Sequence, residues 1–439
     1  MSLFSNRCKP FWWAGLTGIT VLSTILFFQV VSQTSIDGLI RGDTKDYLAY
    51  AFNLKTYGVY SHIWPEAAAA APAPDALRAP GYPFLLSLFV GTDNETFPIA
   101  KVLFVQAALG VLTVIIYVLL YRRFLPTGWA LAAGLMTAIC PHLINASVYL
   151  LTESLFTFLL GAHLLILERA MRSAHFRWAL LAGTLLALSF LVRPTSQYLI
   201  LAYLAALLAW FRYVPRPHWK CVAYLVLPVI LAAGAWSARN VVETGRFSDP
   251  ALTANFLQHG MYINMMYENH PETYGYPYRY DPANQEIEGN TGKILEIIGQ
   301  KFQQEPRRYL AWLLIGKPIQ FFSWNLTESV GDAFIFAPTY SPYFDQELFA
   351  ITHTVAKAFH PFLMFLGVIG ACIAIFQARK NTTAMLLAVV TFYFIAIHII
   401  GAPFPRYSVP LRPISYGLAF FALHTATQHV WTRFKGITR

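Results

Sequence analysis

The sequence predicts an all-α polytopic membrane protein, and three observations lead to that fold class. Of the 439 residues, 56% are hydrophobic and only 12% are charged, which is about half the charged fraction of an average soluble domain. The mean hydropathy is +0.47. Apolar runs long enough to cross a hydrocarbon core of about 30 Å recur along the chain, and basic residues collect in alternate connections between those runs.

Ten full spans are predicted in a single domain that covers residues 1–439, and up to thirteen are possible. The uncertainty lies between residues 309 and 378. There an apolar run is broken by Lys317-Pro318, so we expect a half-span or an interfacial helix. The ten spans are predicted at residues 11–31, 97–120, 128–147, 151–167, 178–192, 197–211, 221–238, 362–376, 384–400 and 411–431.

The charge distribution sets the expected orientation. With the N-terminus inside, the inner loops and tails hold 15 of the 32 Lys and Arg residues but only one acid, Glu168. The net charge of +10 is therefore an excess on the inner side. This is the positive-inside pattern, which orients a membrane protein and does not indicate a nucleic-acid partner. We expect a bacterial inner (plasma) membrane location, with the longer polar loops on the outer face.

The first outer loop, residues 32–95, contains a predicted acidic helix. Asp43 and Tyr47 are four residues apart, as are Asp46 and Tyr50, so a helix places each pair on one face. An apolar stripe along the same segment favours a helix that lies in the membrane interface. A carboxylate in the first turn is stabilised by the helix dipole and stays ionised, as a general base must. The alternative is a simple helix cap on a solvated loop.

The same loop ends in Arg78-Ala79-Pro80-Gly81-Tyr82-Pro83. An Asp that opens an Asp-x-x-x-Tyr helix, followed by Arg-x-Pro-Gly-Tyr-Pro, resembles the GT-C class of polyprenyl-phosphate-sugar-dependent glycosyltransferases. The closest patterns are those of protein O-mannosyltransferases and of enzymes that add aminoarabinose to lipid A. The resemblance implies a GT-C-like helical bundle in which Asp43 is the catalytic base and Arg78 binds the donor phosphate.

Other residues of this loop would shape the acceptor site, namely Asp46, Tyr47 and Tyr82. Many members of the class carry a Glu directly after the Asp, whereas this chain has Thr44, so Asp46 is the candidate substitute. The alternative role for the loop arginine is to pin the loop by pairing with Asp75 or Glu66.

Ionisable residues at the outer ends of spans are costly and are candidates for function. Glu153, Arg193, Arg239 and Arg406 lie in Thr-Glu-x-x-Phe, Arg-Pro, Arg-Asn and Arg-Tyr-x-x-Pro motifs, all of which resemble GT-C landmarks. Guanidinium groups match phosphate oxygens, so Arg239 and Arg406 are assigned to the donor phosphate and Glu153 to the acceptor side. The alternatives are a helix cap for Glu153 and a brace within a rigid turn for Arg406. Arg193 is expected to be a structural charge at a helix end.

Together these features predict transfer of a sugar from a polyprenyl-phosphate donor to an acceptor hydroxyl, with inversion, on the outer face of the membrane. The acceptor is a lipid, a glycan or a protein, and the outer loop at residues 241–308 is a possible lid. No cofactor is required, because arginines can neutralise the leaving phosphate; no metal-ligand set is predicted, although a divalent metal is left open. The alternatives are a flippase or transporter of a polyprenyl-linked lipid, and an oligosaccharide polymerase or ligase.

Overall fold

The computed structural model describes residues 9–65, 71–91, 97–209, 219–326 and 332–437, with side chains up to residue 430. Its regular structure is helical, which confirms the predicted fold class. Within the described ranges, the one β-type pairing is an isolated bridge between Ser35 and Tyr340. Part of the expected Ala/Pro spacer, residues 66–70, lies outside the described residues.

Each predicted span coincides with a helix. Among the described residues, six helices are long and apolar enough to cross a membrane, or seven if α5 and the following α6 and η1, bent by 46°, form one span. The chain is therefore an integral, multi-pass membrane protein, and the total of ten spans remains a prediction. The helices at the predicted spans are α1 (Lys9–Gln33), α4 (Ile99–Tyr121), α5 (Thr127–Ala138) with α6 (Pro141–Asn145) and η1 (Ala146–Val148), α7 (Glu153–Ser173), α8 (Phe176–Val192), α9 (Leu199–Ala209), α10 (Trp219–Thr244), α16 (Glu347–Phe376), α17 (Thr382–Ile400) and α18 (Arg412–Ile437).

The helix α16 is longer than the sequence suggests. It begins at Glu347 rather than near residue 362, and it continues through Pro361. A proline inside a helix removes one backbone hydrogen bond. The rest of α16 is held by its packing along α18 and α17, which shows how tertiary contacts override a local helix-breaking signal.

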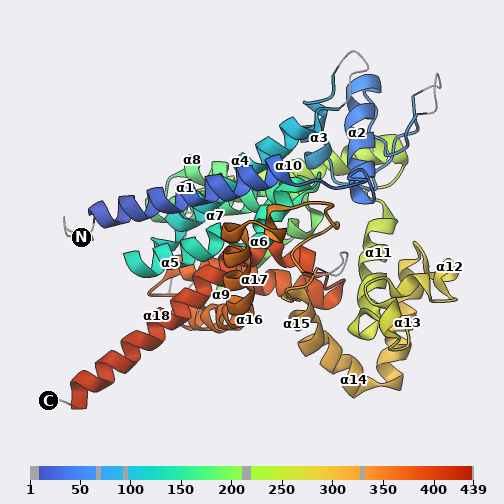
Figure 1. Cartoon of the computed structure of the whole chain (residues 1–439). Helices are drawn as coiled ribbons and strands as arrows, with labels where there is room; N and C mark the ends of the chain where they lie inside the picture. The colour runs from blue at the N-terminus through green and yellow to red at the C-terminus, as the bar shows by residue number, and fades with distance from the viewer. Residues whose placement is uncertain (1–8, 66–70, 92–96, 210–218, 327–331, 438–439) are drawn as a thin grey trace.

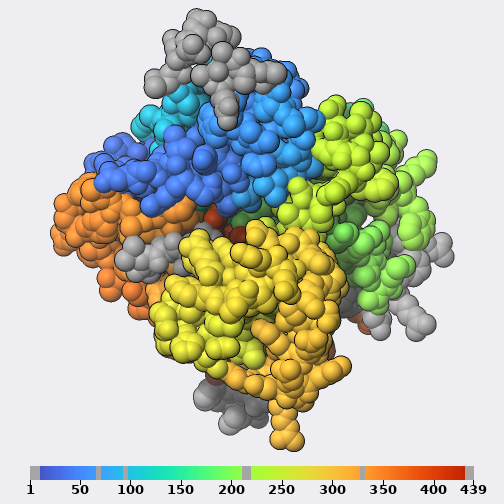
Figure 2. Space-filling view, turned by 90° about the vertical axis from the view of Figure 1, so that its right-hand side faces the viewer, coloured from blue at the N-terminus to red at the C-terminus, as the bar shows by residue number. Residues whose placement is uncertain are grey.

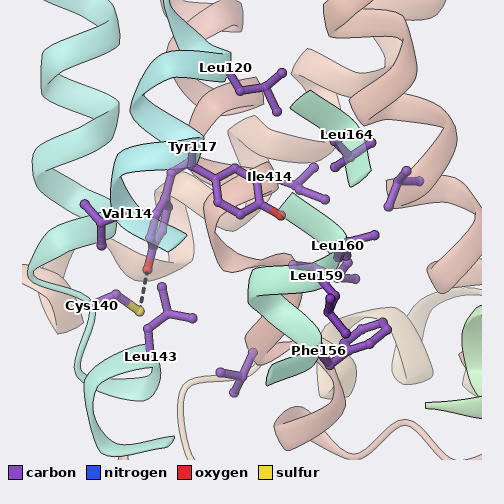
Figure 3. Packing of buried hydrophobic residues seen from close by; sticks show 14 of the residues in the cluster. Val114, Tyr117, Leu120, Cys140, Leu143, Phe156, Leu159, Leu160, Leu164 and Ile414 are labelled. Carbon is purple, nitrogen blue, oxygen red and sulfur yellow. Dashed lines mark hydrogen bonds between the residues drawn. The ribbon is translucent and has the colours of Figure 1, made fainter. Parts of the chain in front are cut away.

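The bundle is built around α7, which packs against α4 and α8, while α10 packs against α8 and α16 lies along α18. Two of these contacts need glycine. A Cβ on Gly370 would lie 2.0 Å from the carbonyl oxygen of Leu418, and a Cβ on Gly183 would lie 2.2 Å from that of Leu225. Small residues of this kind let membrane helices approach closely. Figure 3 shows the apolar core where side chains of α4, α6, α7 and α18 meet.

The polar elements gather at one end of the bundle. Both chain ends lie at the opposite end (Figure 1), an arrangement that fits the predicted orientation. The loop after the first predicted span contains α2 (Asp43–Tyr57) and α3 (Gly81–Ser87), so the acidic helix begins at Asp43 as predicted.

The segment 241–308 folds into α11 (Pro250–Met261), three short 3₁₀ helices, α12 (Asn284–Ile287) and α13 (Thr291–Gln304). A small core of its own joins α11, α12 and α13. The chain continues as α14 (Pro306–Ala311), a π-helical turn η6 (Trp312–Gly316) and α15 (Lys317–Phe321). The buried ammonium of Lys317 donates to the carbonyls of Ile399 and Gly401 at 2.8 and 2.9 Å, and so satisfies the C-terminal end of α17.

Figure 2 views the end of the bundle that carries the polar elements, from the side that faces right in Figure 1. A hollow lies between the blue N-terminal region and the yellow segment that contains α11 to α13. Red atoms from the C-terminal part of the chain are visible at its floor. The ionisable residues singled out in the sequence belong to the elements around this end.

Candidate active site

The base candidate Asp43 owes its position to the residue before it. Gly42 has φ 52° and ψ −133°, a conformation that a residue with a Cβ strongly disfavours. A Cβ added at Gly42 would meet no atom within 4 Å, so the requirement for glycine is conformational and not steric. Behind the helix start, the buried hydroxyl of Thr44 donates to the carbonyl of Leu150 at 3.3 Å. This bond fastens the first turn of α2 to the segment that leads into Glu153.

Arg78 lies against the first turn of α2 and pairs with both of its carboxylates. Its Nη2 donates to Asp43 Oδ1 at 2.7 Å, and its Nε and Nη2 donate to Asp46 Oδ2 at 3.1 and 2.8 Å. The guanidinium also lies 5.8 Å from the ring centroid of Tyr47. The alternative interpretation paired Arg78 with Asp75 or Glu66, whereas the structure pairs it with Asp43 and Asp46. Glu66 lies outside the described residues.

Arg406 approaches Asp43 from the other side. Its Nη2 donates to Asp43 Oδ2 at 3.1 Å, and its Nε donates to Glu153 Oε1 at 2.6 Å. The same Glu153 oxygen accepts from Arg193 Nη2 at 3.2 Å. Asp46, Arg78, Asp43, Arg406, Glu153 and Arg193 thus form one alternating row of charges, which we call the charge ladder.

The ladder runs from the surface into the core. The side chains of Asp46 and Asp43 are 23% and 31% exposed, whereas those of Arg406 and Glu153 are 6% and 0% exposed. Burial tends to raise the pKa of Asp43, but the guanidiniums of Arg78 and Arg406 outweigh it and lower that pKa below its ordinary value. Asp43 is therefore ionised at neutral pH.

The two tyrosines assigned to the acceptor side lie just beneath the ladder. Burial, together with the charge of Asp43, raises the pKa of Tyr47 to about 12, so its hydroxyl is neutral. The ring of Tyr82 meets that of Tyr47 edge-on at 5.2 Å. The hydroxyl of Tyr82 is buried and donates to Gln106 Oε1 at 2.8 Å. Tyr82 thus supports α2 from below and has its hydroxyl engaged within the protein.

Arg239 is not part of the ladder. Its Nη1 donates to the carbonyl of Asp75 at 2.6 Å, and its Nη2 donates to that of Tyr60 at 3.1 Å. Its guanidinium also lies 5.3 Å from the ring centroids of both Tyr60 and Trp236. The Tyr60 hydroxyl in turn donates to the carbonyl of Arg78 at 3.1 Å. Arg239 therefore braces the loop that carries Arg78, and its assignment to the donor phosphate stays a prediction.

Two residues near the site were given no role in it from the sequence. Arg193 was expected to be a structural charge, but it supplies the third cation that balances three ladder carboxylates. The other is His259 of α11, whose ring packs edge-on against Phe404 at 5.1 Å. Burial lowers the pKa of His259, while the carboxylate of Asp43 acts in the opposite direction. Its position at the end of a span is the signal that singled out Arg193 in the sequence, whereas nothing local in the sequence points to His259.

The described residues include no group of three His, Cys, Asp or Glu side chains arranged to share a metal ion. The ladder carboxylates are instead occupied by guanidiniums. The described site can hold an anion between two arginines and an ionised carboxylate beside it.

Comparisons with known proteins place the chain in a structural class. Residues 77–236 match the family described as dolichyl-phosphate-mannose-protein mannosyltransferase. No curated protein matches the chain by sequence. Among solved structures, the oligosaccharyltransferase of Archaeoglobus fulgidus in its apo form superposes with a TM-score of 0.52 at 13% identity, over 98% of this chain and 52% of that one. The same enzyme in complex with Zn and sulfate also gives 0.52, at 15% identity, over 95% of this chain and 50% of that one.

ArnT from Cupriavidus metallidurans, bound to undecaprenyl phosphate, superposes with a TM-score of 0.47 at 12% identity, over 95% of this chain and 60% of that one. The chain spans about half the length of the archaeal enzyme it superposes on. The comparisons confirm that this membrane protein has the GT-C fold, as the sequence motifs suggested.

Proposed function

We propose that the chain is an inverting glycosyltransferase that moves a sugar from a polyprenyl-phosphate donor to an acceptor hydroxyl. The observation that carries the proposal is the position of Asp43, an ionised and partly exposed carboxylate held between Arg78 and Arg406. A base beside two cations suits a reaction in which a hydroxyl loses a proton while a phosphate leaves. The lower-lying Glu153 and Arg193 hold Arg406 in that arrangement.

The chemical step uses these groups as follows. The acceptor oxygen attacks the anomeric carbon, and the bond from that carbon to the phosphate oxygen breaks. The electron pair stays on the phosphate, whose second negative charge is stabilised by Arg78 and Arg406. The acceptor proton passes to Asp43, a contribution of about 10²–10⁴ in rate. A single displacement of this kind inverts the configuration at the anomeric carbon.

Support for a polyprenyl-phosphate donor comes from the family match over residues 77–236, which contains Arg78 and Glu153. The GT-C fold shared with an oligosaccharyltransferase supports sugar transfer at a membrane surface. The acceptor class is left as a lipid, a glycan or a protein. A metal is not needed for this scheme, because the arginines neutralise the leaving group.

The segment 241–308 is proposed as a lid over the hollow of Figure 2. His259 contacts Phe404, and a cluster of Met265, Tyr309, Trp312, Ala402 and Phe404 joins the lid to the turn that carries Arg406. Movement of the lid would therefore displace the turn that carries Arg406. We place this end on the outer face of a bacterial inner membrane, because the basic inner loops lie at the other end.

The test is a transfer assay with purified protein, a panel of synthetic polyprenyl-phosphate sugars and envelope lipids as acceptors. Wild-type protein should release polyprenyl phosphate and label an acceptor, and Asp43→Asn should do neither at a measurable rate. If Asp43→Asn retained near-normal turnover, the general-base role would be wrong. Movement of the lipid across proteoliposomes by both proteins, without transfer, would favour the transporter alternative.

A further inference from the structure

The Asp43 carboxylate accepts a hydrogen bond from each of two arginines. Its Oδ1 accepts from Arg78 and its Oδ2 accepts from Arg406, at 2.7 and 3.1 Å. A carboxylate that bridges two guanidiniums in this way uses the positions that two phosphate oxygens would take, because guanidinium forks bind the two groups alike. A donor phosphate that binds Arg78 and Arg406 must therefore compete with Asp43.

Each arginine also has a second carboxylate that Asp43 does not share. Arg78 holds Asp46 through its Nε as well as its Nη2, and Arg406 holds Glu153 through its Nε. If Asp43 left, both Nε bonds would remain and each guanidinium would keep its position. On both arginines the bond that would be lost is the one from Nη2 to Asp43, and on Arg78 the same Nη2 would still donate to Asp46.

The two remaining carboxylates differ from Asp43 in how they are held. Glu153 is fully buried and also pairs with Arg193, so an incoming ligand cannot replace it without opening the core. Asp46 receives two hydrogen bonds from one arginine, whereas Asp43 receives one from each of two. Asp43 is also the most exposed of the three carboxylates, at 31%. It is thus the carboxylate that an entering anion displaces.

We propose that the donor phosphate and the Asp43 carboxylate exchange places on Arg78 and Arg406, while Asp46 and Glu153 act as positioning carboxylates that keep the two guanidiniums fixed. This proposal rests on the proposed function. Before the donor binds, Asp43 is tied to both cations and is a poor base. Donor binding releases it beside the anomeric carbon, so the base becomes active only when a donor is present.

The charges balance through the cycle. The ladder has three carboxylates and three guanidiniums, and the phosphodiester of the donor adds one negative charge. During transfer, Asp43 gains the acceptor proton and becomes neutral, while the phosphate gains one negative charge, so the total is unchanged. Release of the polyprenyl phosphate and of the proton lets Asp43 return to the two arginines. Return of Asp43 thus helps to expel the product.

The experiment measures binding of a polyprenyl phosphate without a sugar to purified protein in detergent micelles. Asp43→Asn removes the competing carboxylate, and we expect its Kd to be about tenfold lower than that of wild type, since a charge-assisted hydrogen bond no longer opposes binding. Asp46→Asn is the matched control, because it removes the same charge beside the same arginine but also removes the anchor of Arg78. Its Kd should be equal to or higher than that of wild type. Melting temperatures confirm that each variant is folded.

The outcomes separate this proposal from the proposed function. If Asp43→Asn binds no more tightly than wild type, or if Asp46→Asn tightens binding to the same extent, the exchange is wrong. Arg78→Ala tests the site itself and should weaken binding at least about tenfold. If wild type does not bind the probe, or binds it as well without Arg78, the assignment of the donor site fails, and with it the proposed function.

Discussion

Glu153→Ala tests the buried half of the charge ladder. The Glu153 side chain is 0% exposed, and its Oε1 accepts from Arg406 at 2.6 Å and from Arg193 at 3.2 Å. Truncation leaves two guanidiniums inside the protein without that counter-ion. A buried charge that loses its partner destabilises a protein more than the intact pair stabilised it.

The expected cost is about 3–5 kcal/mol of unfolding free energy, the range for breaking a buried ion pair. Glu153→Gln keeps an oxygen that accepts from both arginines but loses the charge. Since charge-assisted hydrogen bonds are roughly twice as strong as neutral ones, we expect about half the cost of the alanine variant. The predicted order of decreasing unfolding free energy is therefore wild type, Glu153→Gln and Glu153→Ala.

Chemical unfolding in mixed micelles, followed by a spectroscopic signal from the helices, measures these differences. Asp46→Ala is the control, because it removes a ladder carboxylate that is 23% exposed and should cost only about 0–1 kcal/mol. If Glu153→Ala were as stable as Asp46→Ala while transfer was lost, the electrostatic reasoning would be refuted. Glu153 would then act on a substrate instead of holding Arg406.

Three further predictions concern Asp43, the start of α3 and the orientation of the chain. The pKa of Asp43 is lowered in the folded protein, so its ionisation adds stability that is present above its unfolded pKa of about 3.9 and is lost as the pH falls further. The unfolding free energy should therefore fall less for Asp43→Asn than for wild type when the pH is lowered from about 7 to about 3. An equal fall for both proteins would contradict this prediction. Gly81→Ala would place a Cβ 2.9 Å from the backbone of Leu191 and should cost about 1–3 kcal/mol, whereas Gly18→Ala, with no atom within 4 Å of the new Cβ, should leave the melting temperature near that of wild type. In a variant without native cysteines, Asn290→Cys should react with an impermeant maleimide from outside and Ala174→Cys only after permeabilisation, and the reverse pattern would overturn the proposed orientation.

Local chemistry in the sequence was enough to place most helices. Hydrophobic runs coincide with the helices at each predicted span, and an acidic first turn located the polar helix α2. The sequence placed an acidic helix that begins at Asp43, and α2 begins there. These signals act within a few residues, so they can be recognised without knowledge of the fold. At η6 the sequence indicated only a break at Lys317-Pro318, and the π-helical turn that precedes it was not predicted.

The sequence also nominated five of the six ladder residues, because ionisable groups at the ends of spans are rare and costly. Their pairing was decided by tertiary structure alone. Asp43 and Arg406 are 363 residues apart, and only the packing of α7 and η8 (Pro405–Leu411) beside the loop at α2 brings them together. The contrast between two arginines makes the same point. Arg193 and Arg239 both close an apolar span on the same side, and the sequence favoured Arg239 for the site. In the structure, Arg193 points toward Glu153 in the ladder, whereas Arg239 points toward the carbonyls of Asp75 and Tyr60. The direction in which a helix-end side chain points depends on how that helix is rotated against its neighbours, and this rotation is set by packing across the whole bundle.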